Sequence, residues 1–343
     1  MTRRSRLCTV LLVFFAASAA LAGTGFAQAK ALIGARYPAV SPDGKQIAFS
    51  YMGDIWIVPS DGGRAFRLTD HIAYDREPVW SPDGRWIAFT SNRSGSNDVF
   101  LVSPSGGPVR QLTFHTGDDA ATDFAPDGKS VVFRSGRASS SSLYTVPVSG
   151  GTEQPLLETY WNWAHHGRIS PDGRSLVFSR GSENSYWWRT GYRGANASKL
   201  WIRDMNTGAV KRIVDDPANS FWPDWGPDGA RIYFVSDRKA GVYNIWSVAA
   251  SGAEPRAVTD FGKGDVRFMS VAAGTPVAVY ERDYGIWRTD LLTGASRAVA
   301  IQAPAETKEN RTFIVENAPA SEYKLSPDGK KIAAVVRGEI FVL

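Results

Sequence analysis

The stretch AVSPDGKQIAFS, residues 39–50, places a tight turn between two short apolar runs. Nearly the same sequence returns as VWSPDGRWIAFT (79–90), DFAPDGKSVVFR (123–134), RISPDGRSLVFS (168–179), DWGPDGARIYFV (224–235) and KLSPDGKKIAAV (324–335). Repeats spaced by about 40 to 45 residues indicate an array of similar units, each too small to bury a core alone. The repeat therefore predicts the architecture before any functional motif is considered.

The turn in each copy has residue types that suit a hairpin. Pro presets φ at the first central position, Asp can bond the backbone beyond it, and Gly adopts the left-handed conformation. The run that follows repeats an aliphatic and an aromatic residue at period-2 spacing, which predicts a strand with one buried face. Its buried positions are predicted to be an aliphatic and an aromatic residue: Ile47 and Phe49, Ile87 and Phe89, Val131 and Phe133, Leu176 and Phe178, Ile232 and Phe234.

A third and a fourth strand complete each copy. The third strand carries an aromatic residue at a constant place, and a Gly-containing turn leads to the fourth. Four antiparallel strands per copy, without helical periodicity after the amino terminus, are typical of β-propeller blades. The expected fold class is all-β: a six-bladed β-propeller of four-stranded antiparallel blades, followed by the truncated start of a second propeller.

The blades are predicted at 36–69, 76–113, 120–158, 164–214, 220–259 and 267–300. The sixth is degenerate, with Ala273-Gly274-Thr275 in place of the turn, but it keeps the buried spacing. The expected organisation is a propeller over 30–302, a linker over 303–318 and a partial first blade of a second propeller over 319–343.

Two arrangements fit this blade count. Either Lys30–Gly34 supplies the strand that the last unit lacks and closes a seven-bladed ring, or six blades close alone. The second is favoured because the linker interrupts a steady spacing, and because an unclosed strand edge is an aggregation hazard. The sequence therefore looks like a fragment of a longer protein.

The amino terminus has the pattern of a secretory signal peptide. Arg3, Arg4 and Arg6 precede an apolar run over 7–21, and Ala27-Gln28-Ala29 is a small-x-small cleavage site. The apolar run falls short of the ~20 residues that span a bilayer, so a signal over 1–29 is preferred to a retained anchor. Export without a stable membrane anchor after cleavage predicts a periplasmic location.

Cleavage would change the charge of the chain and its cysteine content. The formal charge would fall from +5 to +2, with 36 basic and 34 acidic residues remaining. A balance so near neutrality gives no reason to expect a nucleic-acid partner. Cys8 is the only cysteine and would leave with the signal, so no disulfide, thiol nucleophile or cysteine metal site is expected.

Motifs that carry chemistry are not found in the sequence. There is no G-x-S-x-G elbow, no H-E-x-x-H and no Gly-rich phosphate loop. His71 and His115 occupy equivalent loop positions of two blades, which favours a structural role. No catalytic residue, metal site or cofactor is therefore assigned, and the residues leave open whether the chain belongs to an enzyme.

Blade four departs from the repeat. From the turn proline to the third-strand aromatic takes 14 to 19 residues in the other regular units but 30 from Pro171 to Trp201. The insertion is GSENSYWWRTGYRGANAS (181–198), and the loop that enters the blade is ETYWNWAHH (158–166). In a four-stranded blade these two loops lie on the same face of the propeller.

The two loops are rich in aromatic and cationic side chains that a blade core does not need. Such side chains are typical of surfaces that bind peptides or proteins. The candidate binding residues are Trp161, Trp163, His165, His166, Trp187, Trp188, Arg189, Tyr192 and Arg193. Alternatively, the insertion buries its tryptophans as a local cap over its own blade, and the sequence leaves both interpretations open.

The S-P-D-G blades resemble the repeats of TolB-like propellers, and more narrowly the first propeller of tricorn-protease-like serine peptidases. YPAVSPDGKQIAFSYMGDIWIVPSDGG (37–63) looks like their opening blade, and EYKLSPDGKKIAAVVRGEIFVL (322–343) looks like the opening of their second propeller. W-x-x-GYRG with KLWI resembles their blade-four insertion, through Trp188, Tyr192, Arg193 and Gly194.

The resemblance implies a six-bladed and a seven-bladed propeller, a PDZ-like domain and a catalytic region in which a Ser nucleophile and a His base degrade peptides. The expected function is that of a non-catalytic, exported amino-terminal propeller that serves peptide substrate access or docking in proteolysis. Its expected partners are peptides or unfolded polypeptide, together with the downstream propeller, PDZ-like and catalytic regions of the parent protein. The alternative is a free-standing TolB-like periplasmic scaffold that binds envelope proteins.

Overall fold

The computed structural model describes residues 32–137, 140–157, 163–252, 255–304, 320, 322–336 and 339–342. These residues form strands and turns almost throughout. They contain no α-helix, and their one 3-10 helix is η1 (Ser182–Tyr186). In this part of the chain no helix is long and apolar enough to cross a bilayer. The predicted all-β architecture is confirmed.

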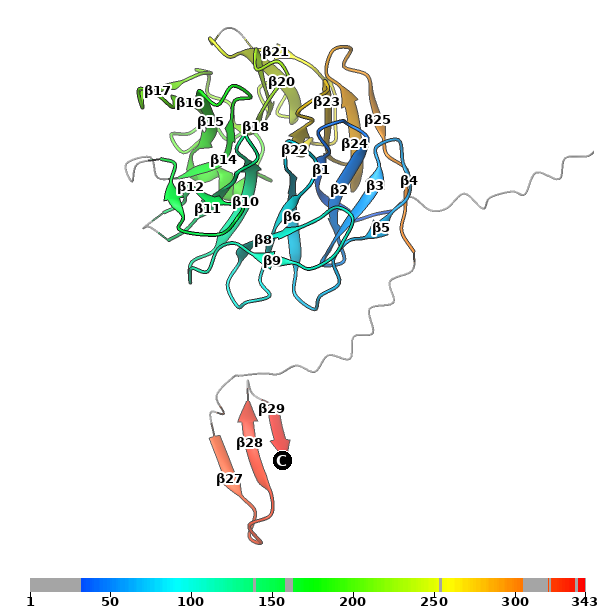
Figure 1. Cartoon of the computed structure of the whole chain (residues 1–343), viewed down its shortest axis with the longest axis vertical. Coiled ribbons are helices and arrows are strands. Elements are labelled where there is room, and N and C mark those ends of the chain that lie inside the picture. The colour runs from blue at the N-terminus through cyan, green and yellow to red at the C-terminus, as the bar shows by residue number, and fades with distance from the viewer. Residues whose placement is uncertain are drawn as a thin grey trace, which may run out of the picture. The chain divides into compact units, whose positions relative to one another are not determined.

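Six four-stranded antiparallel sheets follow one another along the chain (Figure 1). The first three contain β1 (Arg36–Val40), β2 (Gln46–Tyr51), β3 (Asp54–Pro59) and β5 (Phe66–Arg67); β6 (Asp75–Trp80), β7 (Ile87–Ser91), β8 (Asp98–Val102) and β9 (Arg110–Gln111); and β10 (Asp119–Phe124), β11 (Ser130–Ser135), β12 (Ser142–Pro147) and β13 (Gln154–Pro155). The last three contain β14 (Ala164–Ile169), β15 (Ser175–Arg180), β16 (Lys199–Asp204) and β17 (Val210–Arg212); β18 (Ser220–Trp225), β19 (Arg231–Ser236), β20 (Asn244–Ala249) and β21 (Arg256–Ala257); and β22 (Arg267–Val271), β23 (Val277–Arg282), β24 (Gly285–Asp290) and β25 (Ser296–Ala298).

The repeated turn joins the first two strands of a sheet, as its residue types predict. In the first copy, Ser41 donates through Oγ to the Asp43 carboxylate at 2.7 Å, and that carboxylate accepts the Lys45 backbone N–H at 3.0 Å. Gly44 has φ 73°, the left-handed conformation. These hydrogen bonds lower the pKa of Asp43 below its ordinary value. The turn therefore explains why Ser, Asp and Gly recur, without any bound ligand.

The core lies between neighbouring sheets, where the second strands present the predicted pairs of apolar side chains. All of these side chains are fully buried, at 0% exposure: Ile47, Phe49, Ile87, Phe89, Val131, Phe133, Leu176, Phe178, Ile232 and Phe234. The residues between them are buried as well, among them Ala48, Ala88, Val132 and Val177, so the expectation of a single buried face was wrong. In the first sheet, Ile47 and Phe49 pack toward the sixth sheet and Ala48 packs toward the second.

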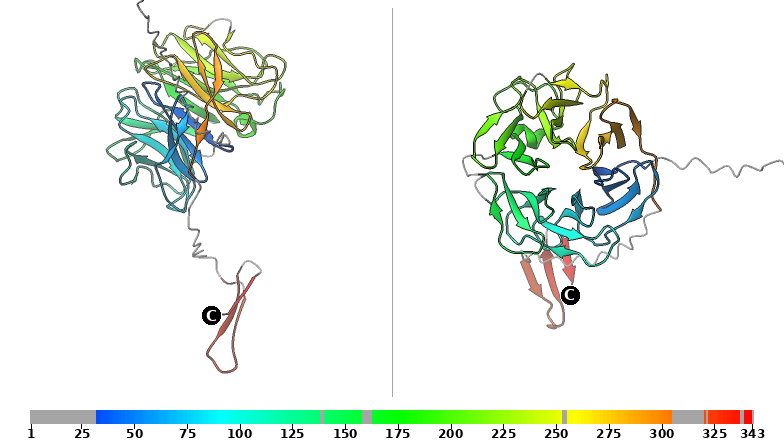
Figure 2. Two further views of the ribbon diagram at one scale, coloured as in Figure 1. Left: turned by 90° about the vertical axis from the view of Figure 1, so that its right-hand side faces the viewer. Right: turned by 45° about the horizontal axis from the view of Figure 1, so that its top comes forward.

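The six sheets contact each other in chain order, and the sixth contacts the first through β22, β23 and β1. Figure 2 shows them as a ring around a common axis. After the sixth sheet, β26 (Ile301–Gln302) pairs in parallel with β4 (Gly63–Arg64). The short strand β4 lies in sequence between β3 and β5 of the first sheet. This direct contact between the first and last sheets is consistent with six blades.

A separate three-stranded antiparallel sheet contains β27 (Glu322–Leu325), β28 (Ile332–Val336) and β29 (Glu339–Val342). It repeats the turn chemistry, because Ser326 Oγ donates to Asp328 and the Lys331 N–H returns to that same Oγ at 3.0 Å. Apolar side chains on it are exposed, including Tyr323 and Ile340. That this sheet begins a second propeller, and the boundaries of the linker before it, stay predictions.

Candidate functional site

The first strand of every four-stranded sheet carries a β-bulge that aims side chains at the ring axis. In each of these sheets the pairing between the first and second strands is interrupted by a register shift. Regular pairing resumes three residues before the turn proline, or before the residue that replaces it in the sixth sheet. Five of the six bulges hold a residue at positive φ: Tyr37 (52°), Glu77 (55°), His166 (52°), Trp222 (46°) and Phe268 (49°). Bulges redirect side chains, and strained left-handed residues of this kind cluster at functional sites.

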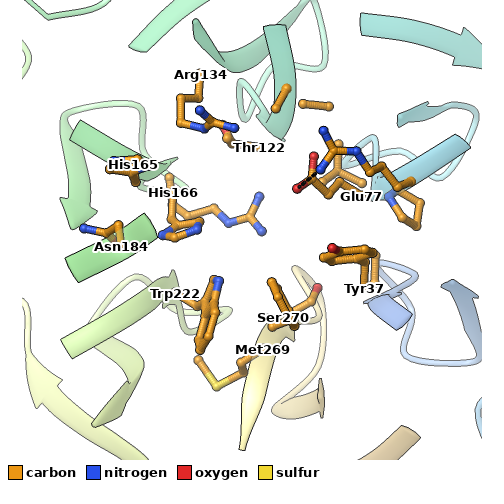
Figure 3. A pocket seen from close by; sticks show the side chains of 18 of the residues that line it. Tyr37, Glu77, Thr122, Arg134, His165, His166, Asn184, Trp222, Met269 and Ser270 are labelled. Atoms are coloured by element: carbon orange, nitrogen blue, oxygen red, sulfur yellow. Dashed lines mark hydrogen bonds and ion pairs between the residues drawn. The ribbon is translucent and has the colours of Figure 1, made fainter. Parts of the chain in front are cut away.

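These redirected side chains surround a cavity of about 270 Å³ on the ring axis (Figure 3). One part of its wall is aromatic. Phe268 contacts Tyr37, Trp222 and Trp187, with ring centroids 4.6, 4.8 and 4.9 Å apart. His166 continues this wall, with its ring centroid 5.7 Å from that of Trp222. The aromatic wall therefore combines four inner strands, β1, β14, β18 and β22, with the blade-four insertion.

Polar side chains also line the cavity, and two of them are neutral imidazoles. Burial, and then the charge of Arg134, lowers the pKa of His165 to about 3. Burial also holds the pKa of His166 well below its ordinary value, with the neighbouring His165 and Arg134 adding to the shift. Arg76 and Glu77 lie on the same wall and pair with each other at 3.4 Å.

Three charged side chains meet deeper on the axis. The Arg168 guanidinium lies 3.1 Å from Asp123 and 3.7 Å from Asp224, so it connects three inner strands. Burial raises the pKa of Asp123 to about 6; the Arg168 guanidinium opposes this shift and the Asp224 carboxylate adds to it. A second cavity, of about 320 Å³, lies beyond these residues toward the S-P-D-G turns, and Arg168 lines both cavities.

The blade-four insertion is held in place by buried polar contacts. Asp237, which is fully buried, accepts the Gly191 backbone N–H at 2.7 Å and pairs with Arg193 at 2.9 Å. Arg189 donates through Nε to the buried Glu183 carboxylate at 3.0 Å and lies over the Tyr192 ring. Asp237 directly follows β19, so these contacts anchor the insertion to the neighbouring fifth sheet.

The predicted binding residues occupy three different places. His165, His166 and Trp187 line the axial cavity, whereas Trp163 lies in a separate cavity beside Trp201. Arg189, Tyr192 and Arg193 belong to the contacts that hold the insertion, and the Trp188 ring is 56% exposed. Trp161 lies outside the described residues. Trp187 packs against the core of the fifth and sixth sheets and not over its own blade, and that these residues bind a peptide or a partner stays a prediction.

Sequence reasoning missed most of the axial residues, although the repeat contains a signal for them. Five places before the turn proline or its equivalent stand Tyr37, Glu77, Ala121, His166, Trp222 and Phe268. Three places before it stand Ala39, Val79, Asp123, Arg168, Asp224 and Ser270. At these two positions the residue type changes from blade to blade, and several of the residues are large or charged. A comparison of the blades at these positions therefore identifies the side of the strand that faces the axis.

The ring of four-stranded antiparallel sheets, with its site where the inner strands converge, defines the chain as a β-propeller. A comparison with protein families matches residues 34–295 to the tricorn protease N-terminal β-propeller domain, and the chain belongs to this family.

Relatives agree with this assignment. The chain is 31% identical over 311 residues to tricorn protease homolog 1 of Streptomyces coelicolor, covering 89% of this chain and 28% of that protein. It is 26% identical over 170 residues to a tricorn protease homolog of Saccharolobus solfataricus, covering 49% of this chain and 15% of that protein. The chain thus spans less than a third of the length of these relatives.

Solved structures match the fold. The crystal structure of the tricorn protease superposes with a TM-score of 0.68 at 25% identity, covering 90% of this chain and 30% of that one. A putative TolB from Agrobacterium tumefaciens superposes with a TM-score of 0.56 at 21% identity, covering 66% of this chain and 80% of that one. The predicted resemblance to tricorn-like and TolB-like propellers is confirmed.

Proposed function

We propose that this chain is the non-catalytic amino-terminal propeller region of an exported tricorn-like serine peptidase, and that its axial cavity docks peptide substrate. The observation that carries the proposal is the aromatic wall built by Tyr37, Trp187, Trp222 and Phe268 at the point where the inner strands converge. Three of these residues, Tyr37, Trp222 and Phe268, stand at left-handed bulge positions in the inner strands.

The wall suits an extended polypeptide. Concave sites bind ligands through apolar and aromatic surface, with a few polar groups that fix orientation. Here the aromatic rings would cover apolar side chains, while the polar residues opposite them would bind backbone or side-chain groups of the peptide. The ion pairs of Arg168 separate the two axial cavities. This arrangement favours docking of a short segment at one mouth of the channel.

The parent protein and its location belong to the same proposal. Family membership supports a parent that adds a second propeller, a PDZ-like domain and a catalytic region with a Ser nucleophile. The signal-like segment over 1–29 supports export to the periplasm. Fractionation of cells that express the natural gene tests export: the protein should appear in the periplasmic fraction with residues 1–29 removed, and a cytoplasmic, uncleaved protein would contradict it.

Peptide binding is tested with a matched pair of aromatic variants. Tyr37 and Trp163 both stand at positive φ, but only Tyr37 lines the axial cavity. Tyr37→Ala should weaken the binding of an unfolded polypeptide about tenfold, a loss of about 1.4 kcal/mol, and Trp163→Ala should bind like the parent. Calorimetry measures both. Unchanged binding by Tyr37→Ala contradicts docking at the cavity, and hydrolysis of the polypeptide by this chain contradicts the non-catalytic assignment.

A further inference from the structure

Arg134 is a cation of the axial cavity that pairs with no carboxylate among the residues that the structure describes. It extends from β11 beside Thr122, on the side of the cavity opposite Trp222 (Figure 3). Within the described ranges no hydrogen bond or ion pair joins its guanidinium to the protein. The other two cavity arginines differ in this respect, because Arg76 pairs with Glu77, and Arg168 pairs with two aspartates. The side of the cavity next to Arg134 therefore carries an unbalanced positive charge.

Two buried nitrogens of the cavity wall also lack partners. His165 Nε2 and Trp222 Nε1 make no hydrogen bond, and each of these residues is 6% exposed. A buried polar group that is left unsatisfied costs about 1–3 kcal/mol. The indole N–H can only donate, and the neutral imidazole can donate or accept. Both nitrogens are fully buried, so a ligand in the cavity gives them a partner only if the surrounding side chains move.

The side chains of His165 and His166 are neutral, so the positive charge in this part of the cavity comes from the Arg134 guanidinium. Burial and the Arg134 charge keep the His165 ring uncharged near neutral pH, so it contributes polarity without repelling a cation or attracting an anion. Across the cavity, Trp222, Phe268 and Tyr37 form apolar surface. A ligand that satisfies both sides carries a negative charge at one end and an apolar group at the other.

We infer that the axial cavity selects a peptide segment that bears a carboxylate, which pairs with Arg134 while an adjacent apolar or aromatic side chain packs against Trp222 and Phe268. This inference rests on the proposed function and adds its substrate class. The volume of about 270 Å³ lies at the low end for ligand pockets, which suits a segment of one or two residues.

The carboxylate has two sources in a peptide, a Glu or Asp side chain and the chain terminus. Three short peptides separate them: acetyl-Ala-Phe-Glu-Ala-amide, its Gln counterpart, and acetyl-Ala-Phe-Gln-Ala with a free carboxyl end. Titration of the full chain by calorimetry should show that one or both carboxylate peptides bind about tenfold more tightly than the Gln amide. The peptide that shows this preference identifies the source.

Arg134 variants connect the preference to this residue. Arg134→Gln should remove the preference and leave the weaker binding of the Gln amide peptide, whereas Arg134→Lys should retain part of it because the charge remains. Arg174→Gln is the control, since Arg174 lies in a surface turn and does not line the cavity. Circular dichroism confirms that each variant is folded, so that a loss of binding is not a loss of structure.

The outcomes separate this inference from the function on which it rests. Equal affinity for all three peptides overturns carboxylate selection and leaves peptide docking standing. A preference that survives Arg134→Gln also overturns the inference, because the carboxylate then binds elsewhere. Absence of binding by every peptide in the set contradicts both the inference and the proposed docking function.

Discussion

His165 and His166 are two adjacent imidazoles that the fold keeps neutral at the wall of the axial cavity. Both have their pKa lowered, first by burial and then by nearby positive charge. His166 Nδ1 lies 3.0 Å from the Ser179 hydroxyl, while His165 Nε2 has no partner. These two side chains are therefore shielded from water, and the hydrogen-bonding capacity of His165 is not fully used.

This desolvation predicts a dependence of stability on pH. Because the folded pKa of His165 lies at about 3 and the unfolded value near 6.5, the unfolded chain binds a proton first as the pH falls. The stabilisation is therefore complete above pH 6.5 and is lost on acidification. Between pH 6.5 and 5 the loss from His165 should be about 2 kcal/mol, with a further loss from His166.

Urea unfolding of His165→Gln at pH 7.5, 6.5 and 5 measures this effect. The variant should lose markedly less free energy of unfolding between pH 6.5 and 5 than the parent, because only one of the two buried imidazoles remains. Above pH 6.5 the two curves should run parallel, which serves as the internal control. The same steep loss in the variant would show that His165 is protonated in the folded chain.

At the scale of elements, the S-P-D-G turns and the strands beside them could be predicted because their signals are local. The Ser, Asp and Gly of each turn bond within a few residues, and period-2 spacing identifies one of the two buried faces of each second strand. The second buried face comes from packing between two neighbouring sheets, which has no local signal. The axial side chains could not be predicted in the same way. Their direction depends on the bulge in each inner strand, and the meeting of Asp123, Arg168 and Asp224 depends on three strands that lie far apart in sequence.

The blade-four insertion shows the same limit. Its aromatic and cationic composition drew attention to the region, but composition alone did not separate anchors from exposed groups. Arg193 is an anchor because its partner, Asp237, lies 44 residues further along the chain and is fully buried. Trp188 belongs to the same W-x-x-GYRG motif as Arg193, but its side chain is exposed.

Arg193→Gln should therefore loosen the insertion. The Arg193 side chain is 35% exposed, and the Asp237 carboxylate keeps the backbone N–H donors of Gly191 and Asn219, so the loss should be about 1 kcal/mol. Thermal unfolding should report the loss, and limited chymotrypsin digestion should cut within 181–198 sooner than in the parent. Trp188→Ala serves as the matched control and should leave thermal stability unchanged. Equal stability of Arg193→Gln and the parent would mean that Asp237 is held by its backbone donors alone.

At the scale of the whole molecule, ring closure brings residue 300 against the first sheet. The Gly63 N–H donates to the Ala300 carbonyl, and the Leu32 N–H donates to the Ile301 carbonyl at 3.2 Å. A Cβ added at Gly62 would lie 2.7 Å from the Ala300 carbonyl oxygen. At Gly106, the equivalent position in the second sheet, a Cβ would meet nothing within 4 Å.

This pair of glycines measures closure directly. Gly62 and Gly106 both have positive φ, so alanine at either position costs about 1–2 kcal/mol of backbone strain. Gly62→Ala also forces the closing backbone to move, which should destabilise the chain by about 2 kcal/mol more than Gly106→Ala. Thermal denaturation of the two variants tests this difference. Equal losses would contradict the contact between the first sheet and the segment that follows the sixth.

Photocrosslinking tests whether polypeptide docks where the inner strands meet the blade-four insertion. An unfolded peptide that carries a photoreactive phenylalanine analogue is irradiated with the chain, and the adducts are mapped by mass spectrometry. We expect adducts on the inner strands β1, β14, β18 and β22 and on residues 181–198. Adducts confined to the outer strands β5, β9 and β17, or the absence of any adduct, would contradict it.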